Sequence, residues 1–210
     1  MRKIVAAAVA VLLCFTSFAQ TSKQKAAFGF KAGFNISSFR TAVEYETFDP
    51  GLKAGFAVGA FVDIPVSRKF SVQPEFFYNQ MGAKAFDNAF GDKTFRLNYF
   101  SVPILVKFRA AKNFNVLVGP EMDFLIRASE EDIDDHVERI TNDIKDFDFA
   151  VTAGAEFILS KNITIGARYI HGTQDISTTA NENTLFNQGV HFNFAWKLLK
   201  KTKKAKTAAK

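Results

Sequence analysis

Charged side chains recur at alternate positions inside stretches that are otherwise apolar. In residues 51–64, every even position is apolar, whereas the odd positions hold glycine, alanine, Phe61, Lys53 and Asp63. Acids and bases that share one face away from water should pair, because an unpaired buried charge is very costly. We therefore expect an interior charge network made of Lys31, Lys53, Glu75, Lys107, Glu121, Asp123, Glu156 and Arg168. Asp63 and Asp148 lie on the same inward face. Such a network is either a structural plug or a gated conduit in which ion pairs exchange partners.

Signatures of catalysis and metal binding are weak. The chain has three histidines, His136, His171 and His191, and they lack the paired spacing of a zinc site. His171 and Ser177 are the one combination that suggests a lipid-modifying enzyme at a membrane rim, but a lone histidine there is more often an interface anchor. We therefore predict no catalytic residues, no metal and no cofactor.

The alternation defines eight segments, each of the length that crosses a bilayer as a tilted strand. One face of each segment is apolar, with many of the 25 phenylalanines, and the other is rich in glycine with few charges. A soluble lipocalin-like barrel or β-sandwich would need a more polar outer face. The segments are 28–36, 51–64, 70–78, 100–108, 114–124, 147–159, 163–169 and 190–198.

Short and long links alternate strictly between these segments. The short links are 65–68, 110–112 and 160–162, and the long ones are 38–50, 82–95, 126–146 and 173–187. Because a sheet edge in hydrocarbon would leave backbone groups unpaired, the sheet must close. We predict an all-β, eight-stranded antiparallel up-and-down transmembrane β-barrel with short periplasmic turns, long extracellular loops and a lumen filled by side chains.

The two ends of the chain differ in character from this central part. Residues 1–19 have the charged start, apolar core and small-residue cleavage site of a signal peptide. Residues 20–198 form the predicted barrel, and 199–210 form a lysine-rich tail that we expect to be disordered in the periplasm. The tail and the leader account for the net charge of +6, so the basic balance does not indicate nucleic acid as a partner.

The most acidic link is "RASEEDIDDHVERITNDIKD", residues 127–146. Its apolar residues Ile133, Val137, Ile140 and Ile144 recur at helical spacing. This spacing is compatible with a short amphipathic helix above the barrel rim, and the alternative is a solvated charged loop. The glycine and ligand spacing of a calcium loop is missing from this link.

Several motifs resemble a known family. "GFKAGFNISSF", "VQPEFFYNQMGAK", "LNYFSVPILVKF", "NFNVLVGPEMDFLI" and "ITIGARYIHGTQDI" are similar to segments of PorT-like outer-membrane β-barrel proteins of the Bacteroidetes, often labelled porin family. The resemblance extends over residues 26–198. It implies an eight-stranded barrel, and for one branch a link to secretion and surface presentation of proteins, but it supplies no catalytic residues.

These observations predict a protein of the bacterial outer membrane that is exported by means of a signal peptide. We expect a non-enzymatic structural or interaction barrel, associated with secretion on the family resemblance; the alternative is a narrow small-solute channel. Its expected partners are outer-membrane lipid and lipopolysaccharide, the barrel-assembly machinery and a periplasmic partner for the lysine-rich tail.

Overall fold

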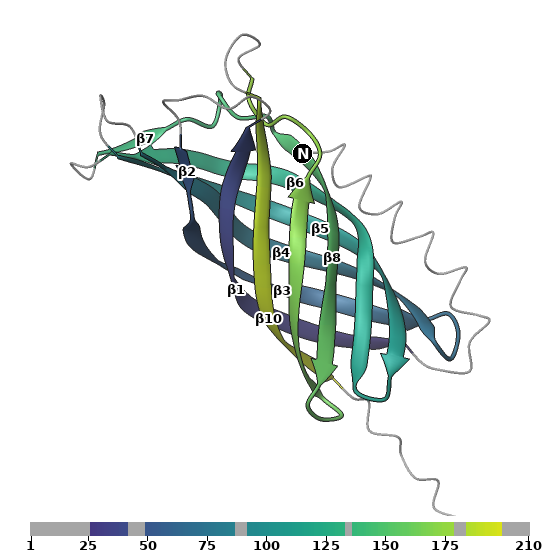
Figure 1. The fold of residues 1–210 in the computed structure, drawn as a ribbon. Coiled ribbons are helices and arrows are strands. Elements are labelled where there is room, and N and C mark those ends of the chain that lie inside the picture. Colours follow the sequence, from purple (N-terminus) through teal and green to yellow (C-terminus); the bar gives the residue numbers. More distant parts are fainter. Residues whose placement is uncertain (1–25, 42–48, 87–91, 133–135, 179–183, 199–210) are drawn as a thin grey trace, which may run out of the picture.

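Ten β-strands make up the regular structure of the computed structural model, which describes residues 26–41, 49–86, 92–132, 136–178 and 184–198 (Figure 1). The predicted signal peptide and lysine-rich tail lie outside the described residues. The strands are β1 (Ala27–Thr41), β2 (Asp49–Gly51), β3 (Lys53–Pro65), β4 (Phe70–Phe86), β5 (Lys93–Ala111), β6 (Phe114–Glu131), β7 (Val137–Arg139), β8 (Phe147–Ile158), β9 (Ile163–Gly172) and β10 (Leu185–Leu198).

Eight long strands form a closed antiparallel ring, which confirms the predicted fold class. Each of them pairs with its neighbours in sequence, and β1 pairs with β10 from Phe28 opposite Leu198 to Thr41 opposite Leu185. This last ladder joins the first strand to the last, so the ring has no free edge. Within the described residues, no helix has the length and apolar character needed to cross a membrane.

Several strands run further toward the long loops than the alternation predicts. β4 has 17 residues and β5 has 19, and their ladder continues to Ala85 opposite Lys93. The short strands β2 and β7 add to this extension by pairing with β4 and β6, at the upper left of Figure 1. In these extensions the outer face carries polar residues such as Lys84 and Arg96, whereas Met81, Leu97 and Tyr99 on the inner face are buried. The alternation therefore continues, but the apolar face is the inner one.

Of the two interpretations of residues 127–146, the helical one is wrong for the described part of that link. Val137 lies in β7, which pairs with β6, and Ile144 forms an isolated β-bridge with Ser177. Ile144 is buried with residues from several strands instead of lying along one helical face. The helical spacing of the apolar residues in this link is therefore coincidental, and tertiary packing decides their conformation.

The outside of the ring is apolar around its circumference. Phe30, Phe56, Phe194 and Trp196 are each about half exposed, and they come from strands on both sides of the β1–β10 closure. A ring with an apolar exterior and a polar interior is stable in lipid and not in water.

Glycines on the inner face accommodate close neighbours of two kinds. A Cβ on Gly29 would lie 2.5 Å from the Phe61 ring, so this glycine makes room for a large lumen side chain, as the sequence predicts. A Cβ on Gly59 would instead lie 2.0 Å from the carbonyl oxygen of Phe76 on β4. Here the glycine lets the adjacent backbone approach, which a side chain would prevent.

Substituting Gly59→Ala should therefore destabilise the barrel, by about 3 kcal/mol, because strand β3 or β4 must move. The measurement is the temperature at which the refolded protein loses the compact, unheated electrophoretic form of a closed barrel. Gly166→Ala is the matched control, since its nearest neighbour would lie at 3.1 Å. Equal loss of the compact form in both variants would contradict the close-approach argument.

Candidate functional site

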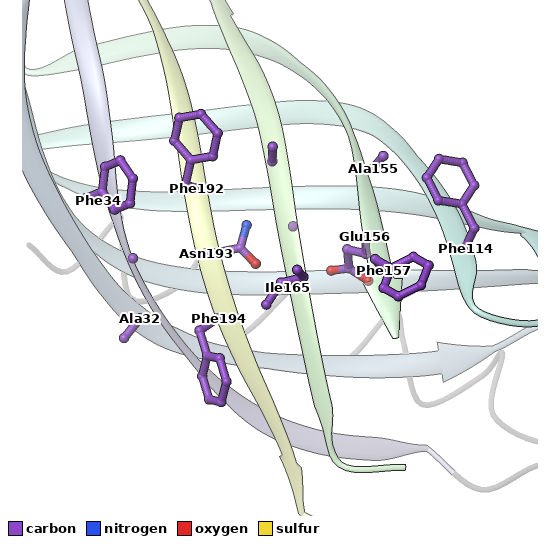
Figure 2. Close-up of a pocket in the computed structure, with 13 residues that line it drawn as sticks. Ala32, Phe34, Phe114, Ala155, Glu156, Phe157, Ile165, Phe192, Asn193 and Phe194 are labelled. Atoms are coloured by element: carbon purple, nitrogen blue, oxygen red, sulfur yellow. The ribbon is translucent and has the colours of Figure 1, made fainter. Parts of the chain in front are cut away.

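The eight residues of the predicted charge network all lie on the inner face of the ring. Each is at most 6% exposed to solvent. Figure 2 shows the alternation that places them: Phe192 and Phe194 of β10 point away from the lumen, whereas Asn193 between them points into it. The members are Lys31 on β1, Lys53 on β3, Glu75 on β4, Lys107 on β5, Glu121 and Asp123 on β6, Glu156 on β8 and Arg168 on β9.

Glu75 is the centre of the ion-paired part of this set. Its Oε1 accepts hydrogen bonds from Lys31 Nζ at 2.6 Å and from Gln73 Nε2 at 2.6 Å. Its Oε2 accepts one from Arg168 Nη1, also at 2.6 Å. A carboxylate that receives three short bonds, two of them from cations, is held ionised and in a single position.

A chain of ion pairs continues from Glu75 across the lumen. Lys31 also reaches Glu156 at 2.8 Å, and Lys107 joins Glu156 at 3.1 Å to Asp63 at 3.2 Å. These residues come from five different strands, including strands that are not neighbours in the ring. The ion pairs therefore brace opposite walls of the barrel.

Two members of the network were missed from the sequence. Arg168 Nε donates to His191 Nδ1 at 3.1 Å, and Lys197 Nζ donates to Asp63 Oδ2 at 2.9 Å. The signal for His191 lies in the strand register, because it stands directly opposite Arg168 between β9 and β10. The Arg168 guanidinium also packs 5.0 Å from the centre of the Phe77 ring, so an inward-facing aromatic side chain belongs to the same cluster.

A second part of the predicted set is purely acidic. Asp123 and Asp148 stand directly opposite each other between β6 and β8, and Glu121 lies two residues from Asp123 on the same face. Glu121 Oε2 accepts from Thr152 Oγ1 at 2.5 Å, and Asp148 Oδ2 accepts from Asn187 Nδ2 at 2.7 Å. One oxygen of each of these carboxyl groups has no hydrogen-bond partner in the described structure. The structure thus divides the predicted network into a neutralised cluster and a group of facing carboxylates.

Lys53 belongs to neither part. Its Nζ donates a long hydrogen bond of 3.4 Å to the carbonyl oxygen of Ala54 at the loop end of β3. Among the described residues no carboxylate forms an ion pair with it.

The loop end of the lumen is closed by apolar side chains. Ile144 and Ile176 enter from the two long loops that flank β8 and β9, and both are buried. They pack in one cluster with inward-facing residues of the barrel wall, namely Phe39, Met81, Ala83, Leu97, Tyr99, Ala128, Ala150 and Ile170. This closure was not predicted, because the loop residues that complete it carry no strand periodicity.

The histidine and serine considered for rim catalysis have other contacts. The His171 ring lies 6.0 Å from the Tyr169 ring on the outer wall. Ser177 sits in the bridge to Ile144, and its backbone N–H donates to Asp175 Oδ1 at 3.1 Å. In the part of the chain that the structure describes, no group of three or more His, Cys, Asp or Glu side chains is arranged to hold a metal ion.

The outer wall carries a shallow apolar groove of about 500 Å³ across β1, β10, β9 and β8 (Figure 2). Small residues such as Ala32 and Ala155 leave space between the rings of Phe34, Phe192 and Phe157. Its lining is the same alternating pattern of side chains that makes the outer wall lipid-compatible.

The two parts of the lumen predict opposite responses to the same chemical change. Glu75→Gln removes the charge that balances Lys31 and Arg168, and should lower the free energy of unfolding by about 3 kcal/mol. Asp123→Asn removes one of two facing carboxylates and should raise the thermal unfolding temperature. Thermal unfolding of the refolded protein in detergent at neutral pH measures both. A loss of stability in Asp123→Asn equal to that in Glu75→Gln would refute the division of the lumen.

Two solved structures are similar to this one. Neisserial surface protein A matches with a TM-score of 0.54 and 11% identity over 83% of this chain and 100% of that chain. The attachment invasion locus protein Ail of Yersinia pestis matches with a TM-score of 0.49 and 16% identity over 83% of this chain and 100% of its own. At these identities, the match to the neisserial protein supports the fold alone. No curated protein is significantly similar in sequence to this chain.

A family profile provides the assignment. The family described as "Outer membrane protein beta-barrel domain" matches residues 18–177, which is most of the chain. The match agrees with the closed ring, its apolar exterior and its charged interior. The chain therefore belongs to the outer membrane protein β-barrel family, and it is a protein of the bacterial outer membrane.

Proposed function

We propose that the protein acts at the membrane surface as a non-enzymatic structural or interaction barrel. One observation carries this proposal: side chains fill the lumen at two levels. The ion pairs around Glu75 brace the walls in one part, and the apolar cluster with Ile144 and Ile176 closes the loop end. Side chains of the described residues thus obstruct the lumen at both levels, which supports a function carried by the exposed parts of the molecule.

The loop end is built as a defined surface. The carboxylate of Asp175 accepts hydrogen bonds from the backbone N–H groups of Ser177 and Leu185 and from Lys145 Nζ at 3.0 Å. The N–H of Lys145 in turn donates to the carbonyl oxygen of Ile176 at 2.8 Å. These bonds join the loop after β9 to the loop before β8. Such a surface suits recognition of a partner better than passage of a solute.

The finer assignment follows the motif resemblance. The segments "NYFSVPILVKF" and "VGP" support a PorT-like branch of the Bacteroidetes, and with it an association with protein secretion. On this proposal the partners are outer-membrane lipid and lipopolysaccharide around the wall, the assembly machinery during insertion, and a periplasmic protein that binds the lysine-rich tail 199–210. Crosslinking in cells with the full chain and with a chain ending at residue 198 tests the tail: the periplasmic adduct should need residues 199–210.

The filled lumen predicts electrical silence. Refolded full-length protein inserted in a planar bilayer should give no stable conductance steps. A double variant, Ile144→Gly and Ile176→Gly, should remain silent, because the ion pairs around Glu75 still fill the lumen. Reproducible open steps from the wild type would instead establish the alternative, a narrow small-solute channel.

The Asp175 contacts predict a pH-dependent and mutation-sensitive loop. Burial alone would raise the pKa of this carboxyl, but the N–H of Leu185, the Lys145 ammonium and the N–H of Ser177 hold it below its ordinary value of 3.8. The contribution of Asp175 to loop stability is therefore complete above that value and is lost as the pH falls through the lowered pKa.

Asp175→Asn should accelerate amide hydrogen exchange at Ser177 and Leu185 at neutral pH by roughly tenfold, because the charge-assisted bonds are weakened. Asp143→Asn, an exposed position in the neighbouring loop, is the control and should leave both rates unchanged. Unaltered exchange in Asp175→Asn would show that the carboxylate does not fix the loop.

A further inference from the structure

A polar hollow lies on the outer wall at the loop end of β3, β4, β5 and β6. Its volume is about 730 Å³. Leu52, Gln80, Lys84 and Arg96 line it from outside the ring, and Lys53 reaches it from the inner face. We call this the rim hollow. It is separate from the charge network around Glu75.

The rim hollow sits where the outer wall changes from apolar to polar. Along β4, Phe76 and Tyr78 are followed by Gln80 and Lys84 on the outer face, and along β5, Phe100 gives way to Asn98 and Arg96. The Tyr78 hydroxyl donates to Asn98 Oδ1 at 3.0 Å, which marks the transition. In an outer-membrane barrel, this is the height at which hydrocarbon ends and lipid headgroups begin.

The strand pairing is irregular at this point. β2 pairs Gly51 with Lys84, whereas β3 pairs Ala57 with Asn79, so the register slips by one residue between them. Gly82 lies opposite the slip with φ of 137°, and a Cβ there would lie 3.2 Å from Cδ of Lys53. The aliphatic part of the Lys53 side chain therefore lies beside Gly82.

Two of the three cations of the rim hollow, Lys53 and Lys84, form no ion pair with a carboxylate of the described residues. Arg96 forms an ion pair with Glu131. Lys53 is only 5% exposed, and its ammonium donates a long bond to the Ala54 carbonyl oxygen. A buried ammonium group without an ion-pair partner is costly, so a phosphate oxygen beside Lys53 would stabilise it. The hollow as a whole is formally neutral, because three carboxylates line it with the three cations, and it therefore suits a zwitterionic headgroup.

We propose that the rim hollow binds the phosphate of an outer-leaflet lipid headgroup. Lys53 and Lys84 bind the phosphate oxygens, with the Arg96 guanidinium beside them. Leu52, 69% exposed, and Ala54 pack against the first carbons of the acyl chains. Asp92, Glu131 and Asp132 line the same hollow and suit the hydroxyl or ammonium donors that accompany phosphate in a headgroup. Inorganic phosphate would contact the cations alone and would make no use of Leu52 and Ala54.

The experiment uses the refolded full chain in octyl glucoside, titrated calorimetrically with dihexanoyl phosphatidylethanolamine. Dihexanoylglycerol, which lacks the phosphate, and inorganic phosphate are titrated in parallel. Saturable binding of the phospholipid, with no binding of the other two over the same concentrations, is the expected result. Equal binding of inorganic phosphate would overturn the lipid source, and equal binding of dihexanoylglycerol would overturn the role of the cations.

Variants test the residues. The double variant Lys53→Met and Lys84→Gln should weaken phospholipid binding by about tenfold or more. Lys84→Gln alone, at an exposed position, should weaken it by about threefold, and it keeps the test decisive if the double variant does not fold. The matched control is Lys69→Gln with Lys161→Gln, two exposed lysines in the short turns at the opposite end. Compact migration without heating verifies that each barrel is folded.

The proposed site would be overturned if the folded Lys84→Gln variant bound the phospholipid with wild-type affinity. It would also be overturned if the Lys69→Gln and Lys161→Gln control lost as much affinity as the site variants. Neither outcome bears on the proposed closed lumen, which the conductance measurement tests separately.

Discussion

The β1–β10 ladder is the interaction on which the rest of this structure depends. In hydrocarbon a backbone N–H or C=O without a partner costs several kcal/mol, so a sheet that spans the membrane must close on itself. Closure with eight long strands leaves an interior just wide enough for side chains. The narrow lumen is thus a consequence of backbone pairing, and the buried charges are a consequence of the narrow lumen.

Charges confined in this way must be neutralised by one another. Around Glu75 this is accomplished, because Lys31 and Arg168 satisfy its two oxygens and Lys31 extends the chain to Glu156. Asp123 and Asp148 face each other without such a cation in the described structure. The ion pairs around Glu75 therefore stabilise the fold and offset the cost of burying the facing carboxylates of Asp123 and Asp148. The interior thus contains both stabilising and destabilising groups.

The sequence shows which side chains point inward, because the period of two is strict along each strand. It does not show which of them meet. Lys31 and Glu75 come from β1 and β4, which are not neighbours in the ring, and their contact depends on the stagger of the strands. Ile144 illustrates a second limit: its spacing suggests a helix, but contacts with residues of other loops and strands determine its position. The loop closure and the rim hollow were therefore accessible only from the structure.

Two successive barriers along the lumen bear on the function of the protein. A solute entering from the loop end would have to displace Ile144 and Ile176 from an apolar cluster, and exposing those side chains to water is unfavourable. It would next have to separate Glu75 from Lys31 and Arg168, and removing a partner from a buried ion pair is among the costliest changes in a protein. Since both barriers lie on the same route, transport would require a rearrangement of loops and lumen together. The loops, the rim and the outer wall need no such rearrangement to meet a partner, and this difference in cost favours a role at the surface.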